Sequence, residues 1–284
     1  FNGKMRFKLE LPMDFSKEQI EEAVMAHEKT QQQLNGRTPK KLIIIPGNHD
    51  GNLRNAARQD AITPLTVALD HPNITLLKYS GEYQFNDKVT FNVLSVFDID
   101  NWIKPTDPSK INIALYHGSI SGCETSLGWV MEHGENDVSI FEGFDYAMLG
   151  DIHKVNQILD DDGRVRYCGS TVQQGFAEEL DKGYLLWDIR SKEDFEVELH
   201  TFVNPKPFIT IELTKTGKIP KKTPTTSGAR IRLVANTKLT IEATRKAADV
   251  ARTRYKPESL TFLNRAGVKL SSVNTEDVTE QNLR

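Results

Sequence analysis

Three apolar segments of this sequence each end in a loop that carries side chains able to bind metal ions. Imidazole, carboxylate and amide oxygen suit manganese, iron or zinc better than calcium. Because open α/β sheets form their sites at the carboxyl ends of their strands, three such loops predict one shared site. The candidate residues are Asn48, His49 and Asp50 after segment 41–45, His117 within segment 111–119, and Asp151 and His153 within segment 146–154.

Each of these groups alone also fits an ordinary structural role. Asn, Asp and Gly favour tight turns, so the Asn48-His49-Asp50 stretch alone is compatible with a plain turn. A single histidine after a strand is more often a core or loop residue than a metal ligand. The occurrence of three such groups in order, each after an apolar segment, is what favours a metal site.

The segments around these loops alternate between strand-like and helix-like patterns, which predicts an α/β fold. A helix is expected over residues 16–34, with Ser16 as its cap and Gln19 in the capping-box position. A second helix is expected over residues 56–69. The expected strands are 41–45, 74–78, 90–97, 111–119, 146–154, 164–171 and 183–189. Segment 41–45 is apolar throughout, which predicts a strand buried on both faces.

Composition narrows the class of protein. The chain has 284 residues, of which 38% are hydrophobic and 26% charged, as in soluble globular proteins. No apolar run is long enough to span a membrane. Cys123 and Cys168 form neither a disulfide framework nor a CxxC metal pair, so we expect a reducing, intracellular setting. Nothing near Phe1 has the order of a signal peptide.

Charge is distributed unevenly and predicts two modules with different partners. Residues 1–204 carry a net charge of −12, residues 205–270 carry +11, and the polar tail 271–284 carries −2. We expect a domain boundary at Pro205 and then a small β-β-α-β unit with strands 208–213, 230–234 and 259–264 and a helix over 240–255. The basic unit is expected to face a polyanion, although the two parts could also simply balance each other. The candidate phosphate contacts are Lys215, Lys218, Lys221, Lys222, Arg230, Arg232, Arg245 and Arg252.

Four stretches carry a resemblance to a known family: GNHDGN, LYHGSISG, LGDIHK and YCGSTVQQGF…GYLLWDI. They resemble the calcineurin-like metallophosphoesterases, in particular the SbcD-like DNA repair and recombination exonuclease subunit of tailed phages. The resemblance covers residues 41–190 well, and beyond Pro205 only the layout is similar. It implies a metallophosphoesterase-type β-sandwich flanked by helices over residues 1–204, with a small α+β DNA-capping domain over 205–270.

The resemblance further implies a two-metal phosphodiesterase that uses Mn²⁺, with Mg²⁺ as an alternative. In that family pattern, Asn48, His117 and Asp151 would bind one metal, and His153 would bind the other. The family usually has a histidine where this chain has Asp151. A carboxylate is a competent ligand for hard metals, so this difference is interpreted as a variant.

The remaining two residues of the triplet would serve the leaving group. His49 would donate a proton to the leaving sugar oxygen or stabilise the transition state, and Asp50 would orient His49. The family's D-x-H strand and G-D-x-x-D strand, which supply further ligands, are not found in residues 1–40. The chain is therefore interpreted as an N-terminally incomplete form, which alone is expected to hold an incomplete metal site and to lack activity.

Partners and alternatives follow from the same resemblance. DNA, an SbcC-like ATPase subunit and a second copy of the complete protein are the expected partners, with no membrane. The resemblance also implies a cytoplasmic location in a bacterial or phage-infected host cell. A general phosphoesterase acting on small phosphorylated substrates is one alternative, and the basic module argues against it. A non-catalytic DNA-binding subunit with an incomplete metal site is the other.

Overall fold

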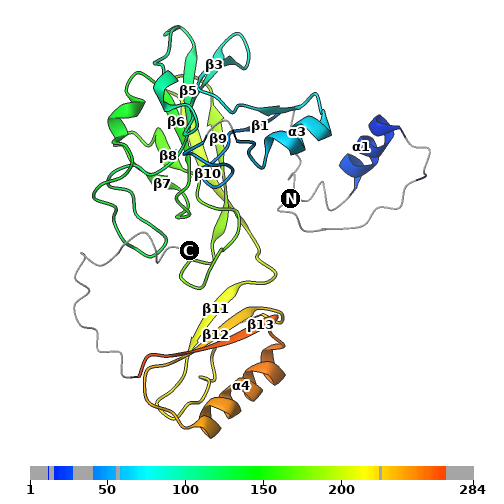
Figure 1. The fold of residues 1–284 in the computed structure, drawn as a ribbon, viewed down its shortest axis with the longest axis vertical. Coiled ribbons are helices and arrows are strands. Elements are labelled where there is room, and N and C mark those ends of the chain that lie inside the picture. Colours follow the sequence, from blue (N-terminus) through cyan, green and yellow to red (C-terminus); the bar gives the residue numbers. More distant parts are fainter. Residues whose placement is uncertain (1–11, 13–15, 28–40, 56–57, 224–225, 267–284) are drawn as a thin grey trace. The chain divides into compact units, whose positions relative to one another are not determined.

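The structure is a computed structural model that describes residues 12, 16–27, 41–55, 58–223 and 226–266. It has two compact units, Phe1–Lys78 and Tyr79–Arg284. The protein is mixed α/β, with several sheets and few helices (Figure 1). In the part of the chain that is described, no helix is long and apolar enough to cross a membrane. Cys123 and Cys168 are both unpaired, as expected.

In the first unit, the start of one helix agrees with the prediction, and the burial of one strand does not. Helix α1 (Lys17–Ala26) begins at Ser16, and its capping box with Gln19 is present as expected. The continuation of this helix to residue 34 lies outside the described residues. Strand β1 (Leu42–Ile44) pairs in parallel with β2 (Ile74–Leu76) in a two-stranded sheet. The prediction that this strand is buried on both faces is wrong, because Leu42 is 51% exposed and its neighbours are half-buried.

The second helix of this unit is shorter than predicted. Helix α3 (Thr63–Leu69) begins at residue 63, whereas helix was expected from residue 56. Proline in the first turn favours a helix start at this point. The Asp60 carboxylate accepts hydrogen bonds from the backbone N–H groups of Ile62 (2.9 Å) and Thr63 (2.6 Å), so it satisfies donors that the helix leaves open.

A six-stranded sheet forms the centre of the second unit. Its order is β3-β4-β5-β6-β8-β7, with parallel pairing from β4 to β8 and an antiparallel strand at each edge. Short 3₁₀ helices η1 (Ile99–Asn101) and η2 (Val138–Phe141) lie in the connections. The strands are β3 (Gly81–Gln84), β4 (Val89–Leu94), β5 (Ile111–His117), β6 (Tyr146–Gly150), β7 (Gln157–Ile158) and β8 (Val165–Tyr167).

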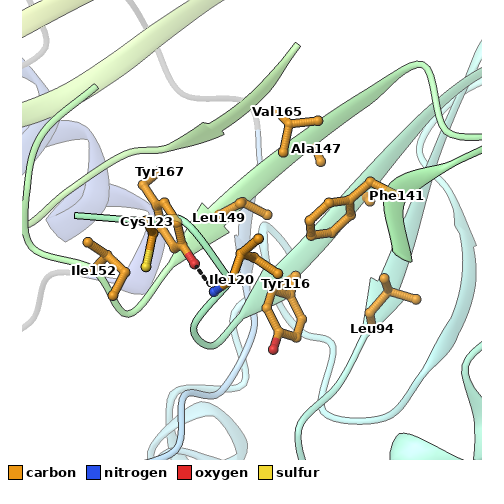
Figure 2. Packing of buried hydrophobic residues seen from close by; sticks show 11 residues of the cluster. Leu94, Tyr116, Ile120, Cys123, Phe141, Ala147, Leu149, Ile152, Val165 and Tyr167 are labelled. Atoms are coloured by element: carbon orange, nitrogen blue, oxygen red, sulfur yellow. Dashed lines mark hydrogen bonds between the residues drawn. The ribbon is translucent and has the colours of Figure 1, made fainter. Parts of the chain in front are cut away.

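The main core packs against β5, β6 and β8 (Figure 2). Tyr116 is fully buried and meets Trp102 and Phe141 edge to face, at ring distances of 5.7 and 5.8 Å. Tyr167, on β8, is also fully buried and points its hydroxyl toward the loop that follows β5. The core therefore lies directly beneath the ends of the strands that carry the candidate site.

Two further elements complete the second unit. Strands β9 (Lys182–Ile189) and β10 (Phe195–Phe202) form an antiparallel ribbon. Strands β11 (Phe208–Glu212), β12 (Arg230–Ala235) and β13 (Ser259–Asn264) form a parallel sheet, and α4 (Ile241–Tyr255) packs on one side of it (Figure 1). Buried residues such as Ile231, Leu233 and Ala251 form a separate core between this sheet and α4. The predicted β-β-α-β layout of residues 208–264 is thereby confirmed.

Candidate active site

His117 and Asp151 lie together at the carboxyl ends of two adjacent parallel strands. His117 is the last residue of β5 and pairs with Gly150, the last residue of β6, so Asp151 follows directly beside it. The His117 Nε2 and Asp151 Oδ1 atoms are 3.5 Å apart. Two ligands about 2.1 Å from one ion lie roughly 3.0–3.5 Å apart. This pair therefore has a spacing that fits joint binding of one cation.

The backbone at this point is adapted to bring the two side chains close. A Cβ at Gly150 would lie 2.9 Å from Nδ1 of His117, so a larger residue there would push the imidazole away. Asp151 has φ +93°, in the region that favours glycine. Such strained non-glycine backbone is typical of functional sites.

The turn that follows His117 is held by a buried tyrosine. The Tyr167 hydroxyl donates a hydrogen bond to the carbonyl of Gly118 (2.7 Å) and accepts one from the N–H of Ile120 (2.9 Å; Figure 2). Both bonds fix the backbone within three residues of His117.

Burial raises the pKa of Tyr116, the residue before His117, to about 12, and nearby carboxylates including Asp151 add to this.

His153 has a partner that the sequence analysis did not identify. Its Nδ1 lies 2.7 Å from Oε1 of Glu178, in the loop between β8 and β9. Burial alone would raise the pKa of Glu178, but hydrogen bonds from the Gln174 N–H and His153 and the charge of Lys182 outweigh it, so the pKa is lowered. No sequence signal separates Glu178 from its neighbour Glu179, because the contact spans 25 residues and depends on loop geometry.

The Asn48-His49-Asp50 triplet belongs to the first unit. The Asp50 carboxylate accepts a hydrogen bond from the N–H of Gly47 (2.7 Å), and the Asp50 N–H donates to the Gly47 carbonyl (3.0 Å). This closes a tight turn that follows β1. The orientation of His49 by Asp50 stays a prediction.

A hollow of about 610 Å³ lies beside this turn. His49 and Asp50 line it together with Arg54 and Arg58. Asp60 also lines it, so the two arginines balance the two carboxylates as well as offering donors to an anion such as a phosphate group. These arginines were not predicted as site residues, although they follow the triplet closely along the chain.

Two contacts of the candidate residues lie within the second unit. His117 and Asp151 form one pair, and His153 is held by Glu178. Across the residues described, no group of three or more His, Cys, Asp or Glu side chains is gathered as a metal site. The expected sharing of one site by all six residues stays a prediction.

The eight basic candidates of residues 205–270 do not share one surface. Arg245 and Arg252 are exposed on α4, and Arg252 pairs with Asp249. Arg230 and Arg232 alternate with the core residues of β12, so they lie on the sheet face away from α4. Their guanidinium groups stack over the rings of Phe208 and Phe176, at 4.8 and 4.4 Å. Lys215, Lys218, Lys221 and Lys222 are exposed in the loop between β11 and β12.

Comparisons with known proteins give two kinds of relative. No family model matches the chain. The SbcD component of the nuclease SbcCD of Staphylococcus epidermidis is 28% identical to this chain over 223 residues. The match covers 68% of this chain and 56% of that protein. An uncharacterized protein of Acanthamoeba polyphaga mimivirus is 36% identical over 197 residues, which are 64% of this chain and 14% of the relative.

The second kind of relative is similar over a short segment. The leucine–tRNA ligase of Christiangramia forsetii is 68% identical over 47 residues, which are 16% of this chain and 5% of the ligase. The chain therefore spans about half of the nuclease relative and a small part of the others. The nuclease similarity supports a metallophosphoesterase-like relationship and suggests a nuclease-like protein.

Proposed function

We propose that this chain acts in a Mn²⁺-dependent DNA nuclease that hydrolyses phosphodiesters in recombination and double-strand-break repair. The observation that carries the proposal is the juxtaposition of His117 and Asp151 at the ends of adjacent parallel strands. The similarity to the SbcD component of the nuclease SbcCD supports the same reaction class. The fold we propose for residues 1–204 is the metallophosphoesterase sandwich.

The residues present fit a hard divalent cation. Imidazole and carboxylate are the donors that His117 and Asp151 offer, and these suit Mn²⁺. Asn48 is a further proposed metal ligand, and His153 would hold a second ion. Bound ions of this kind supply an activated water and stabilise the charge that develops on the phosphate.

His49 would act on the leaving group. A histidine placed off the metals can donate a proton to the sugar oxygen as the phosphodiester bond breaks, which contributes roughly 10²–10⁴-fold in rate. Arg54 and Arg58, which line the same hollow as His49, would bind a neighbouring phosphate. These residues would position the scissile bond next to the proton donor.

DNA would be held by the exposed lysines of the β11–β12 loop and by Arg245 and Arg252 on α4. Such contacts neutralise phosphates without reading sequence. An SbcC-like ATPase and a second copy of the same protein would be the protein partners.

The test uses the complete protein with linear duplex DNA, in Mn²⁺ and again in EDTA. The wild-type protein is expected to cleave the DNA in Mn²⁺ and to leave it intact in EDTA. His117→Ala should lose cleavage and weaken Mn²⁺ binding, and His49→Ala should lose cleavage by roughly 100-fold with Mn²⁺ binding retained. His133→Ala changes an exposed histidine of the second unit and should behave as wild type.

The alternatives give different results. Hydrolysis of p-nitrophenyl phosphate without cleavage of DNA would indicate a phosphoesterase for small substrates. DNA binding without Mn²⁺-dependent cleavage would indicate a non-catalytic subunit. Equal cleavage by wild type and His49→Ala would contradict the proton-donor role.

A further inference from the structure

Glu178 makes the most direct contact with His153 that the structure records. One carboxylate oxygen, Oε1, lies 2.7 Å from His153 Nδ1. The two residues are 25 positions apart, so the contact is created by the fold. Glu178 was not among the predicted site residues, and the proposed reaction does not use it.

The carboxylate of Glu178 is fixed from several sides. Its second oxygen, Oε2, accepts a hydrogen bond from the N–H of Gln174 (3.0 Å) and lies 3.3 Å from the ammonium of Lys182. Lys182 is only 2% exposed, and its ammonium also donates to the backbone carbonyl of His153 (2.7 Å). Lys182 therefore holds the two ends of the Glu178–His153 contact at once.

The loop that carries Glu178 is in turn held by β11. Buried Gln173 donates to the backbone carbonyl of Glu178 (2.8 Å) and accepts from the N–H of Phe208 (3.0 Å). The rings of Phe176 and Phe208 meet edge to face at 5.0 Å. The position of Glu178 thus depends on contacts at both ends of its loop.

A carboxylate at this place determines which imidazole nitrogen carries the hydrogen. An ionised carboxylate only accepts hydrogen bonds, so the Nδ1 atom facing it must be the donor. In a neutral imidazole, the other nitrogen, Nε2, then presents a lone pair. Carboxylates that bind the far nitrogen of a ligating histidine also fix its ring orientation and raise its basicity.

We propose that Glu178 is a positioning residue that holds His153 as the Nδ1–H tautomer, with Nε2 directed to a divalent cation. This inference rests on the proposed function for the identity of the cation. The orientation and tautomer of His153 belong to the metal-free protein and are independent of it.

The first experiment measures the tautomer in the full-length, metal-free protein. Long-range ¹H–¹⁵N spectra of ¹⁵N-histidine distinguish the two neutral forms, and His153→Gln identifies the signal. Wild type should show the Nδ1–H form. Glu178→Ala should lose this preference, Glu178→Asp should restore part of it, and Glu179→Ala, at the exposed neighbouring glutamate, should leave it unchanged.

The second experiment measures Mn²⁺ binding by electron paramagnetic resonance, without DNA. Glu178→Ala should weaken the affinity of the affected ion by about 10–100-fold, as for other outer carboxylates. Glu178→Gln keeps the shape of the side chain and an accepting oxygen but removes the charge, so a weaker Mn²⁺ affinity is expected for it as well if the alanine variant does not fold.

An unchanged His153 tautomer in the folded Glu178 variants would overturn the inference. A Mn²⁺ affinity of these Glu178 variants within twofold of wild type would also overturn it. If wild type shows the Nδ1–H form but binds no Mn²⁺, the positioning of His153 stands while the proposed function and the role of Nε2 fail.

Discussion

Tyr167→Phe removes one hydroxyl from the core beneath the candidate site. This hydroxyl is fully buried and bonds to two backbone groups, the carbonyl of Gly118 and the N–H of Ile120. The substitution keeps the aromatic ring, so the packing of the core changes little. The lost interactions are therefore almost entirely the two hydrogen bonds.

The size of the effect follows from burial. A typical hydrogen bond contributes about 0.5–1.5 kcal/mol net, and a buried group left without a partner costs about 1–3 kcal/mol. With no water to replace the hydroxyl, the loss at the two backbone groups should total about 2–4 kcal/mol. Because small proteins have urea slopes of about 1–3 kcal/mol/M, the unfolding midpoint should fall by about 1 M or more.

Urea denaturation followed by tryptophan fluorescence measures this shift. All three tryptophans lie in the second unit, and Trp102 packs against Tyr116 in the same core. Tyr83→Phe is the matched control, since the Tyr83 hydroxyl makes an exposed bond to the carbonyl of Tyr79 and its loss should cost less than about 0.5 kcal/mol. Equal midpoints for the two variants would refute the argument that Tyr167 holds the turn after His117.

Two further predictions concern charge. Burial opposes ionisation of Asp60, but hydrogen bonds from Lys78, Thr63 and the backbone hold its pKa well below the usual range. The ionised Asp60 therefore stabilises the fold above its unfolded pKa of about 3.9, and this stabilisation is lost as the pH falls through its folded pKa. Asp60→Asn should weaken the protection of β2 amides from hydrogen exchange at pH 7. The same variant should make that protection less dependent on acid pH. Charge reversal at Lys221 and Lys222 should reduce the magnitude of the slope of log affinity for duplex DNA against log salt concentration by about 1.8. As the control, Lys88→Glu, in the acidic part formed by residues 1–204, should leave this slope unchanged.

The sequence predicted those parts of the fold that depend on local patterns. Strands β11 to β13 and helix α4 were expected within one residue of their observed bounds, because alternation and a helical apolar stripe are properties of neighbouring residues. Strand β10 was missed, although its residues alternate between apolar and polar and three of the eight, Glu196, Glu198 and Thr201, are polar and exposed. The predicted burial of β1 on both faces was wrong, because an apolar composition does not determine what packs on each face of a strand.

The candidate site was predictable only in part for the same reason. Placing His117 and Asp151 side by side needs only that two strands be parallel neighbours, and their apolar character suggested this. The contact between His153 and Glu178 needs a loop conformation fixed by Lys182 and Gln173, so no local pattern predicts it. Pairings across loops must be taken from coordinates.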